Sequence, residues 1–383
     1  MTRRFYLVTL GCPKNTVDAE AMSALLLAAG WHQTQRAARA DILIANTCGF
    51  IETARQESLD TLRQLARAKK PGQKLLAAGC LSQRWGAELQ ALVPGVDGTL
   101  GTREWARIVS CVEGLCGFPL DAPARPSEQL SVVTPTHRIH TGHSAYLKIS
   151  DGCSAACSFC AIPQIKGPHR SKEWSAILAE VRELADAHVQ EIILIGQDTT
   201  AYGLDLGQHD ALPALIADIC HAAPDVPWLR LMYAYPQHVS PRLIELLATN
   251  PRLCHYLDLP LQHAHPDTLQ RMRRPADIEQ VHLLIEQLRT AVPDIALRTT
   301  FIVGFPGETE SEFQALLDLL QWASFDRVGV FVFSPEEGTV AATLPNQVPG
   351  EVAHERYQRA MELQRAISLQ RNQLQVGRTL PVL

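Results

Sequence analysis

Hydrophobic positions in the first third of the chain fall into short runs separated by longer amphipathic stretches. Four runs have the length and composition of buried β-strands: residues 5–10, 41–46, 74–78 and 96–100. Between the first two runs, Val17–Ala29 has the pattern of an amphipathic helix, which Asn15 or Thr16 would cap and Gly30 would end. Strands that alternate with helices predict an open parallel sheet with helices on its faces.

The same alternation continues in the central part of the chain, where strand, loop and helix follow one another six times. The predicted strands are residues 145–150, 191–196, 228–235, 255–259, 296–303 and 327–333. Helical patterns follow most of them, at residues 172–187, 241–249, 278–291 and 308–322. Six units are too few to close a (β/α)8 barrel. This region is therefore predicted to form a partial (β/α)6 barrel, with its active site beyond the C-terminal ends of the strands.

Segments without this rhythm divide the chain. Residues 117–143 are rich in proline and polar residues and show no period, so we interpret them as a linker. The predicted fold class is α/β, with an N-terminal open parallel sheet domain (1–116) and a barrel domain that ends in a long helix (144–375). The last residues, 376–383, have the pattern of an opening strand of a further domain.

Composition and charge narrow the function classes only slightly. The chain has 383 residues, of which 46% are hydrophobic and 20% charged, as in ordinary globular proteins. A formal net charge of −5 argues mildly against a protein whose main task is to bind nucleic acid. No apolar run is long enough to span a membrane, and the N-terminal run lacks the small-residue cleavage site of a signal peptide. We therefore expect a cytoplasmic protein with no membrane partner.

The ten cysteines point to metal binding, because thiols stay reduced in the cytoplasm. In DGCSAACSFC, Cys153, Cys157 and Cys160 directly follow the first predicted barrel strand. Three closely spaced thiolates can hold a 4Fe–4S cluster and leave one iron open. That iron can bind S-adenosylmethionine, from which one electron then releases a 5′-deoxyadenosyl radical. The alternative is a zinc site with His169 as the fourth ligand.

A second set of cysteines lies at predicted strand ends. Cys12, Cys48 and Cys80 follow the first three strands, in LVTLGC, LIANTC and LLAAGC. Parallel strands share the edge where their carboxyl ends lie and where ligands collect, so these thiols are predicted to converge on a second metal site. The alternative is that they are buried as small hydrophobic residues. The other cysteines show no such placement and are not expected to be ligands: Cys111, Cys116, Cys220 and Cys254.

Two glycine-containing turns at the ends of barrel strands are candidate contacts for S-adenosylmethionine. Gly196, Gln197 and Asp198 end the second barrel strand, where polar groups could meet the methionine amino group. Gly304 and Gly307 lie in GFPGE after the fifth strand, where glycine permits close backbone approach to an adenine. The alternative for both segments is a plain turn.

Three other residues near the predicted barrel site have weaker assignments. Phe159, between two cluster cysteines, would shield the cluster or only pack in the fold. His263 and His265 follow the fourth strand and are expected to line a pocket or lie on the surface rather than bind metal. No side chain is expected to act as a catalytic acid or base.

With these motifs, the whole chain resembles the methylthiotransferases, which have an N-terminal three-cysteine domain followed by a radical S-adenosylmethionine domain. The resemblance implies that the cysteines of residues 153–160 hold the radical-generating cluster. It implies that Cys12, Cys48 and Cys80 hold an auxiliary 4Fe–4S cluster, which supplies or carries sulfur. One S-adenosylmethionine would give a methyl group and another the radical. An electron donor, such as flavodoxin or ferredoxin, and a sulfur donor would be partners.

Four motifs favour one branch of this family, which modifies an aspartate of small-subunit ribosomal protein twelve. They are GCPKN at 11–15, CAIP at 160–163, YAYP at 233–236 and LDLPLQHA at 257–264. The alternative branch acts on adenosine in transfer RNA and usually has GCQMN, CVVP and LHLPVQSGS at these places.

The resemblance to that branch implies transfer of a methylthio group to the β-carbon of the aspartate. The C–H bond there is unactivated, so a radical cofactor is needed to remove the hydrogen. Lys14 and Asn15 would line the gap between the two clusters. Family members commonly continue into a β-barrel called the TRAM domain, and residues 376–383 would be its first strand.

Overall fold

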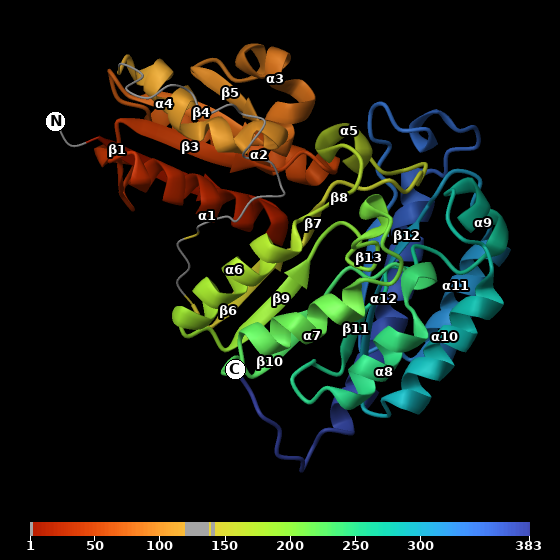
Figure 1. Ribbon diagram of the computed structural model, residues 1–383. Helices are drawn as coiled ribbons and strands as arrows, with labels where there is room; N and C mark the ends of the chain where they lie inside the picture. Colours follow the sequence, from red (N-terminus) through yellow and green to blue (C-terminus); the bar gives the residue numbers. More distant parts are fainter. Residues whose placement is uncertain (1–2, 119–137, 139–141) are drawn as a thin grey trace. The chain divides into compact units, whose positions relative to one another are not determined.

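The structure is a computed structural model that describes residues 3–118, 138 and 142–383 (Figure 1). Most of the predicted linker, 117–143, lies outside the described residues. Contacts group the chain into two compact units: Met1–Ser154 with Ile162–Val189, and Ala155–Ala161 with Gln190–Leu383. Both units are built from strands and helices, which confirms the predicted α/β fold class. The domain limits given above stay a prediction.

The N-terminal part of the first unit is a five-stranded sheet in the order β2-β1-β3-β4-β5, with every pair parallel. The strands are β1 (Arg4–Thr9), β2 (His32–Gln33), β3 (Ile42–Thr47), β4 (Lys74–Gly79) and β5 (Gly98–Gly101). The four predicted strands are confirmed within two residues at each end, whereas β2 is too short to give a hydrophobic pattern. Because β2 and β3 lie on opposite sides of β1, the topology switches direction between β1 and β3. Open α/β sheets bind ligands at such a switch point.

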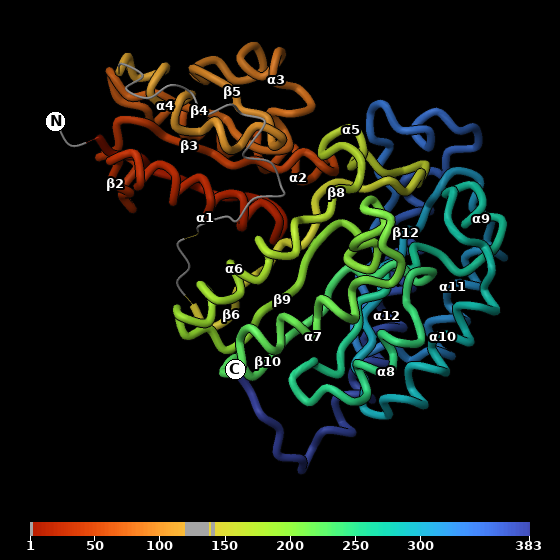
Figure 2. The backbone as a smooth tube through the Cα atoms, viewed as in Figure 1, coloured from red at the N-terminus to blue at the C-terminus, as the bar shows by residue number. Residues whose placement is uncertain are grey.

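Helices cover both faces of this sheet, as Figure 2 shows for the red and orange parts of the chain. On the central strands, Ile44 and Leu76 pack on one side with α1 and α4. Leu43 and Leu75 pack on the other side with α2 and α3. Burial on both faces explains why the strands read as continuous apolar runs. The helices are α1 (Pro13–Ala28), α2 (Glu52–Ala68), α3 (Cys80–Leu92) and α4 (Ile108–Cys116), with short 3-10 turns η1 (Ala37–Arg39) and η2 (Thr102–Arg107).

Helix α1 begins four residues earlier than predicted, and Cys12 stands at its N-cap. The predicted caps, Asn15 and Thr16, are therefore wrong. Pro13 suits the first helical position, because the N–H that proline lacks would have no partner there. Asn15 instead donates from its amide to the Thr47 carbonyl oxygen at 3.0 Å and ties the helix to strand β3.

The rest of the first unit contains the first β/α unit of the predicted barrel. Its elements are β6 (Ser144–Lys148), β7 (Ser150–Asp151), α5 (Ile162–Lys166), β8 (Arg170–Ser171) and α6 (Trp174–Asp186). Strands β7 and β8 pair antiparallel, with Ser150 opposite Ser171 and Asp151 opposite Arg170. This short ladder closes the base of the loop in which Cys153 lies.

The second unit contains the other five predicted barrel strands, all parallel where they pair. They are β9 (Glu191–Ile195), β10 (Trp228–Leu231), β11 (Tyr256–Asp258), β12 (Ala296–Val303) and β13 (Arg327–Val332). Strand β10 ends four residues before the predicted limit, because Tyr233 has a φ of +61° and leaves the extended conformation. The α-helices are α7 (Leu212–Ala222), α8 (Pro241–Thr249), α9 (Pro266–Arg271), α10 (Ile278–Ala291), α11 (Glu310–Ala323) and α12 (Gly350–Gln373). Short 3-10 turns are η3 (Leu204–Leu206), η4 (Pro236–His238) and η5 (Ala341–Thr343).

The predicted C-terminal helix is confirmed as α12, and the segment predicted after it as the opening strand of a further domain does not form a strand in this structure. Residues 376–383 form the end of a turn followed by exposed chain without regular structure. A strand needs a neighbour for its backbone hydrogen bonds, and no strand within the described residues pairs with this segment. Across the part of the chain that the structure describes, none of the helices is both long and apolar enough to cross a bilayer.

Candidate metal centres

Cys12, Cys48 and Cys80 follow three neighbouring strands of the N-terminal sheet. Cys48 directly follows β3, Cys80 directly follows β4, and Cys12 comes three residues after β1. Strand β3 lies between the other two, and Thr47 at its end is opposite Gly79 at the end of β4. The structure therefore brings the three cysteines to one edge of the sheet, beside its switch point. Their role as ligands stays a prediction.

The thiols of this set lie close enough to influence one another. The pKa of the Cys80 thiol is raised to about 12, chiefly by burial; Lys166 opposes this rise, and nearby Cys48 and Cys12 contribute to it. Burial likewise raises the pKa of Cys48, to which Cys12 also contributes. The Cys80 thiol lies 3.6 Å from the Asn15 Oδ1 acceptor. Buried thiols of this kind are protonated without a metal, so metal binding would have to release their protons.

Gly79 allows α3 to begin immediately after β4. Its φ is +97°, and a Cβ there would lie 2.5 Å from both the Asn46 Oδ1 and the Thr47 carbonyl oxygen. Only glycine fits this left-handed conformation so close to a neighbouring backbone. The glycine therefore directs Cys80 toward the end of the sheet rather than onward along the strand.

The spacing of the three thiols fits a cluster better than a single ion. Sulfur ligands of tetrahedral zinc lie about 3.8 Å apart, because Zn–S bonds are about 2.3 Å long. Among the described residues, no three His, Cys, Asp or Glu ligand atoms that lie within 4.8 Å of one another include Cys12, Cys48 or Cys80. No such set includes His169 either. A 4Fe–4S cube accepts thiolates at separate corners and so suits this wider arrangement.

The loop that carries the other cysteine set is held at its start by hydrogen bonds within the first unit. The Cys153 amide donates to the Gly167 carbonyl oxygen at 3.1 Å, and the His169 amide donates to Ser154 Oγ at 3.1 Å. Gly152 has a φ of +77°, and a Cβ there would lie 2.1 Å from the Pro168 carbonyl oxygen. The turn before Cys153 therefore requires glycine.

The later part of the loop belongs to the second unit, where Ser158 anchors it. The Ser158 amide donates to the Met272 carbonyl oxygen at 3.0 Å, and its hydroxyl donates to the Arg271 carbonyl oxygen at 2.7 Å. The Ser158 carbonyl oxygen in turn accepts from the Ala341 amide at 2.8 Å. These three bonds fix the backbone between Cys157 and Cys160.

Arg274 places a positive charge beside one of the predicted ligands. Its Nη1 lies 3.9 Å from the Cys157 Sγ, and its guanidinium stacks over the Tyr235 ring at 4.2 Å. A donor at this distance can hydrogen-bond to the sulfur and so orient it as a metal ligand. The sequence gives no local signal for Arg274, because it lies 117 residues from Cys157.

Phe159 packs against other aromatic side chains in the second unit. Its ring lies edge-to-face with Phe305, with centroids 6.5 Å apart, and it joins a buried apolar cluster around Met272. This packing supports the structural alternative for Phe159 and leaves a shielding role as a prediction.

The turn after β9 holds Gly196, Gln197 and the buried Asp198. One Asp198 oxygen accepts from the Thr200 hydroxyl at 2.6 Å and the Ala201 amide at 3.1 Å. The other lies 3.0 Å from His238 Nδ1. The Asp198 carboxylate therefore stabilises the turn itself, and contact with S-adenosylmethionine stays a prediction for all three residues.

The GFPGE turn after β12 is shaped by its packing within the second unit. Gly304 has a φ of +72°, and a Cβ there would lie 2.3 Å from the Ala353 Cβ on α12. Gly307 has a φ of +76°, and its amide donates to the Asn346 carbonyl oxygen at 2.8 Å. Both glycines therefore have a structural reason to be present, and the predicted approach to an adenine stays a prediction.

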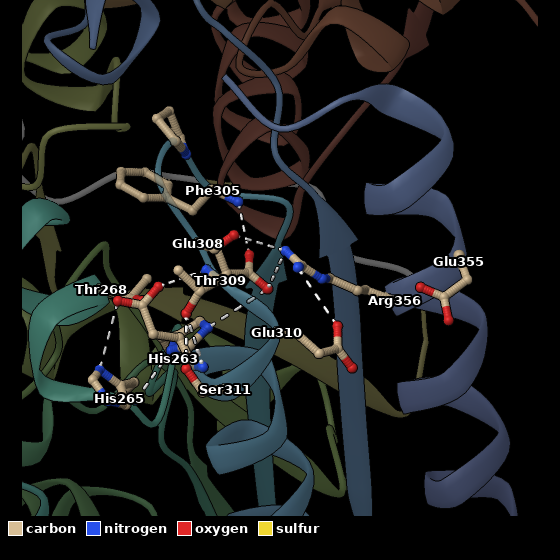
Figure 3. Close-up of polar contacts among 12 residues, drawn as sticks. His263, His265, Thr268, Phe305, Glu308, Thr309, Glu310, Ser311, Glu355 and Arg356 are labelled. Carbon is tan, nitrogen blue, oxygen red and sulfur yellow. Dashed lines mark hydrogen bonds and ion pairs between the residues drawn. The ribbon is translucent and has the colours of Figure 1, made fainter. Parts of the chain in front are cut away.

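The buried carboxylate of Glu308 stabilises this turn, as the close-up in Figure 3 shows. Glu308 accepts from the Phe305 amide at 2.9 Å, and its other oxygen lies 3.4 Å from Arg356 Nη1 and 4.0 Å from His263 Nε2. His263 Nδ1 accepts from the His265 amide at 3.0 Å, so its ring proton is on Nε2, facing Glu308. His263 is buried beside the turn, not surface-exposed.

The four remaining cysteines lie in ordinary packing positions, and all ten cysteines are free thiols. Cys111 and Cys116 on α4 pack against the core of the sheet. Cys220 on α7 is buried, and its sulfur accepts from the Asn250 amide at 3.4 Å. Burial raises the pKa of Cys254, which lies just before β11. None of these positions favours metal binding.

Two family models match the chain in the regions described above. The uncharacterized protein family UPF0004 matches residues 4–101, which carry Cys12, Cys48 and Cys80. The radical SAM superfamily matches residues 147–320, which include the Cys153 loop.

Several relatives are similar to this protein over nearly the whole chain. The ribosomal protein uS12 methylthiotransferase RimO of Roseiflexus sp. (strain RS-1) is 50% identical over 401 residues, covering 99% of this chain and 85% of that protein. The protein of the same name from Heliobacterium modesticaldum is 45% identical, covering 100% and 84%. The radical S-adenosylmethionine methyltransferase TsrM from Kitasatospora setae shares the fold, with a TM-score of 0.67 at 15% identity over 89% of this chain and 77% of that one. The chain therefore belongs to the RimO family of uS12 methylthiotransferases.

Proposed function

We propose that this chain transfers a methylthio group to the β-carbon of an aspartate in ribosomal protein uS12. The relatives that are 45–50% identical over nearly the full chain carry this activity in their name. The observation that carries the proposal is the combination of two cysteine sets in one such chain. One set ends three adjacent strands, and the other lies in a single anchored loop.

The two sets have different tasks in this proposal. Cys153, Cys157 and Cys160 hold a 4Fe–4S cluster whose open iron takes S-adenosylmethionine. When bound, this pair of cofactors supplies a carbon radical that can remove hydrogen from an unactivated C–H bond. The strand-end cysteines hold the auxiliary 4Fe–4S cluster, where the sulfur is delivered.

The protein itself binds and orients the reactants. Arg274 donates to the Cys157 sulfur, and Ser158 fixes the loop that carries it. The turn with Glu308, supported by Arg356 and His263, offers its backbone to the adenine. No step requires a side chain to act as a general acid or base. A strongly basic ribosomal protein is attracted to an acidic enzyme, and the net charge of −5 suits this partner better than transfer RNA.

The reaction also requires partners that supply electrons and sulfur. An electron donor such as flavodoxin or ferredoxin and a separate sulfur donor complete the proposal. The reducing cytoplasm keeps the thiols available for cluster assembly.

The test is anaerobic incubation of the reconstituted chain with S-adenosylmethionine, a reductant and a sulfide source. Either uS12 or transfer RNA is offered as substrate. The expected product is a uS12 peptide about 46 Da heavier, because SCH3 replaces hydrogen, with fragmentation placing the sulfur on an aspartate. Methylthiolated adenosine in digested transfer RNA, with the peptide unchanged, would move the protein to the transfer-RNA branch.

A further inference from the structure

A buried network of charged side chains joins helix α1 to the β/α unit that surrounds the Cys153 loop. Its members belong to one compact unit of the chain. They balance in charge, with four acidic and four basic groups: Asp18, Glu20, Asp151, Glu180, Arg138, Lys148, Lys166 and Lys172.

The half of the network nearest the cysteines is a closed arrangement of two carboxylates and two ammonium groups. Asp18 on α1 accepts from Lys148 Nζ at 2.5 Å and from Lys166 Nζ at 2.9 Å. Asp151 Oδ2 lies 3.3 Å from each of the same two lysines. All four side chains are at most 7% exposed, so water cannot replace these bonds.

The other half continues the network along α1 and α6. Arg138 Nη1 lies 3.2 Å from Glu20 on α1 and donates to the Tyr146 carbonyl oxygen at 2.6 Å. Arg138 Nη2 lies 4.0 Å from Glu180 on α6, and Lys172 pairs with the same Glu180. Asp18 and Glu20 thus hold the first half of helix α1 against β6 and α6.

The network members closest to the cysteines lie on the same elements as the two predicted metal sites. Asp18 lies on the helix that Cys12 begins, and Asp151 lies two residues before Cys153. Lys166 lies near enough to Cys80 to lower the pKa of its thiol. Figure 1 shows α1 beside the segment from β6 to β7, in agreement with their contacts.

Hydrogen bonds from Arg103 also hold the end of helix α5, on which Lys166 lies. Arg103 in η2 donates to the carbonyl oxygens of Gln164 at 2.7 Å and Ile165 at 2.9 Å. A cation suits this position because the carbonyl oxygens at a helix C-terminus have no partner within the helix. Helix α5 is therefore held by two contacts with the N-terminal part of the chain. Lys166 pairs with Asp18, and Arg103 donates to the helix carbonyl oxygens.

Stability alone does not account for a buried ionic network. Desolvation of buried ions offsets much of their attraction, so apolar side chains would hold the two surfaces together as well or better. Ion pairs differ from apolar contacts in that few relative positions satisfy all the charges at once. They therefore specify a register between the packed elements.

We infer that this network is a positioning device, which sets the spacing between the auxiliary cysteines and Cys153. The inference rests on the proposed function, because a single substrate carbon must lose a hydrogen at one site and receive sulfur at the other. Asp18, Lys148, Lys166 and Asp151 are its central positioning residues. They act through the elements that carry the predicted ligands.

The test removes one pair and keeps the network neutral. In the double variant Asp18→Asn/Lys148→Met, iron content and 5′-deoxyadenosine formation should stay near wild type. The coupling, meaning the amount of methylthio transfer per 5′-deoxyadenosine formed, should fall roughly 100-fold. A displacement of about 1 Å can have that effect on a reaction. Pulsed electron paramagnetic resonance of the reduced protein should show a broader distribution of distances between the two clusters. A purely structural role would lower iron content or the folded fraction without this change in coupling.

Two further variants keep the test decisive. Glu20→Gln lies at the partly exposed end of the network, so it should fold and show a smaller loss of coupling in the same direction. The double variant Glu191→Gln/Arg230→Met removes an ion pair between β9 and β10, outside the network, and should leave coupling and cluster distances unchanged. Unchanged coupling and distances in both network variants, with both clusters loaded, would overturn the inference. A wild-type protein that lacks a second cluster or does not modify uS12 would instead overturn the proposed function.

Discussion

The N-terminal sheet and the Cys153 loop each present three thiols, but they assemble them by different routes. In the sheet, Cys12, Cys48 and Cys80 come together only after β1, β3 and β4 have paired. In the loop, three thiols lie within ten residues and need only a local backbone conformation and a few anchors. The sheet thiols therefore come together only through strand pairing, whereas the loop thiols are already close in sequence. Bonds from Ser158 to residues distant in sequence, such as Arg271 and Met272, then hold the loop backbone.

This difference fits the tasks proposed for the two sites. A loop leaves its cluster open on one side, so that S-adenosylmethionine can reach the open iron. A sheet edge at a switch point lies on rigid elements, which hold a second site at a fixed position. The buried ionic network then connects the rigid site to the base of the loop.

The largest expected effect comes from removing either cysteine set. Replacement of Cys153, Cys157 and Cys160 with alanine should abolish 5′-deoxyadenosine formation. Replacement of the strand-end cysteines should abolish methylthio transfer and leave 5′-deoxyadenosine formation measurable, because cleavage of the cofactor needs only the barrel site. Each variant should hold about four irons instead of about eight. The measurements are iron content and chromatography of both products.

The control for this experiment is the set of cysteines that lie in packing positions. Serine at Cys111, Cys116, Cys220 and Cys254 should leave both activities and the iron content intact. A strand-end variant that kept its barrel cluster but formed no 5′-deoxyadenosine would contradict the division of tasks.

A smaller effect should follow from loss of the cation beside the loop. Arg274→Gln removes the guanidinium whose Nη1 lies 3.9 Å from Cys157 Sγ, and with it a hydrogen bond to a predicted cluster ligand. Changes to groups that support metal ligands typically reduce metal affinity or activity about 10- to 100-fold, and we expect 5′-deoxyadenosine formation to fall in that range. The neighbouring Arg273→Gln is the control, because Arg273 is exposed. Equal rates for the two variants would show that Arg274 does not act on the cluster.

Substitution of the crowded Gly79 should destabilise the sheet that carries the strand-end cysteines. Gly79→Ala should lower the free energy of unfolding by about 3 kcal/mol, from the left-handed backbone and the close contact with Asn46 and Thr47 together. Gly72→Ala is the matched control, because Gly72 has a similar φ of +87° but no atom within 4 Å of the added Cβ. Its cost should be about 1 kcal/mol. Chemical denaturation measures both, and equal losses would contradict the role of crowding at the cysteine edge.

The sequence predicted the strands well because their two buried faces leave continuous apolar runs. The runs around Ile44 and Leu76 are examples, since each residue and its neighbour pack on opposite faces. The strand-end position of the three cysteines followed from the same pattern. The order of the strands, which places β1, β3 and β4 side by side, came only from the structure.

Sequence periodicity could not predict polar contacts between residues that are far apart in the sequence. Lys148 and Asp18 are 130 residues apart, and nothing near either residue indicates the other. Asn15 has the features of a helix cap but bonds to a neighbouring strand, because a tertiary acceptor is available at Thr47. The segment after residue 375 forms no strand in this structure, because β-propensity without a pairing partner does not make a strand, and its place in a further domain stays a prediction.

The smallest effect concerns how readily the strand-end thiols react when iron is absent. In the folded apoprotein at pH 8, iodoacetamide should modify the partly exposed Cys12 before the buried Cys48 and Cys80. Burial raises the pKa of Cys80 to about 12, so the thiolate at pH 8 is about one ten-thousandth of the thiol, and it grows tenfold with each pH unit toward that pKa. Mass spectrometry of digested protein gives the rate at each site. Denatured protein is the control, in which the three sites should react alike, because burial no longer separates them. Modification of Cys80 as fast as Cys12 in the folded apoprotein would mean that the sheet edge opens without metal. The long-range site would then form only when its cluster binds, which would make the difference between the two regions sharper still.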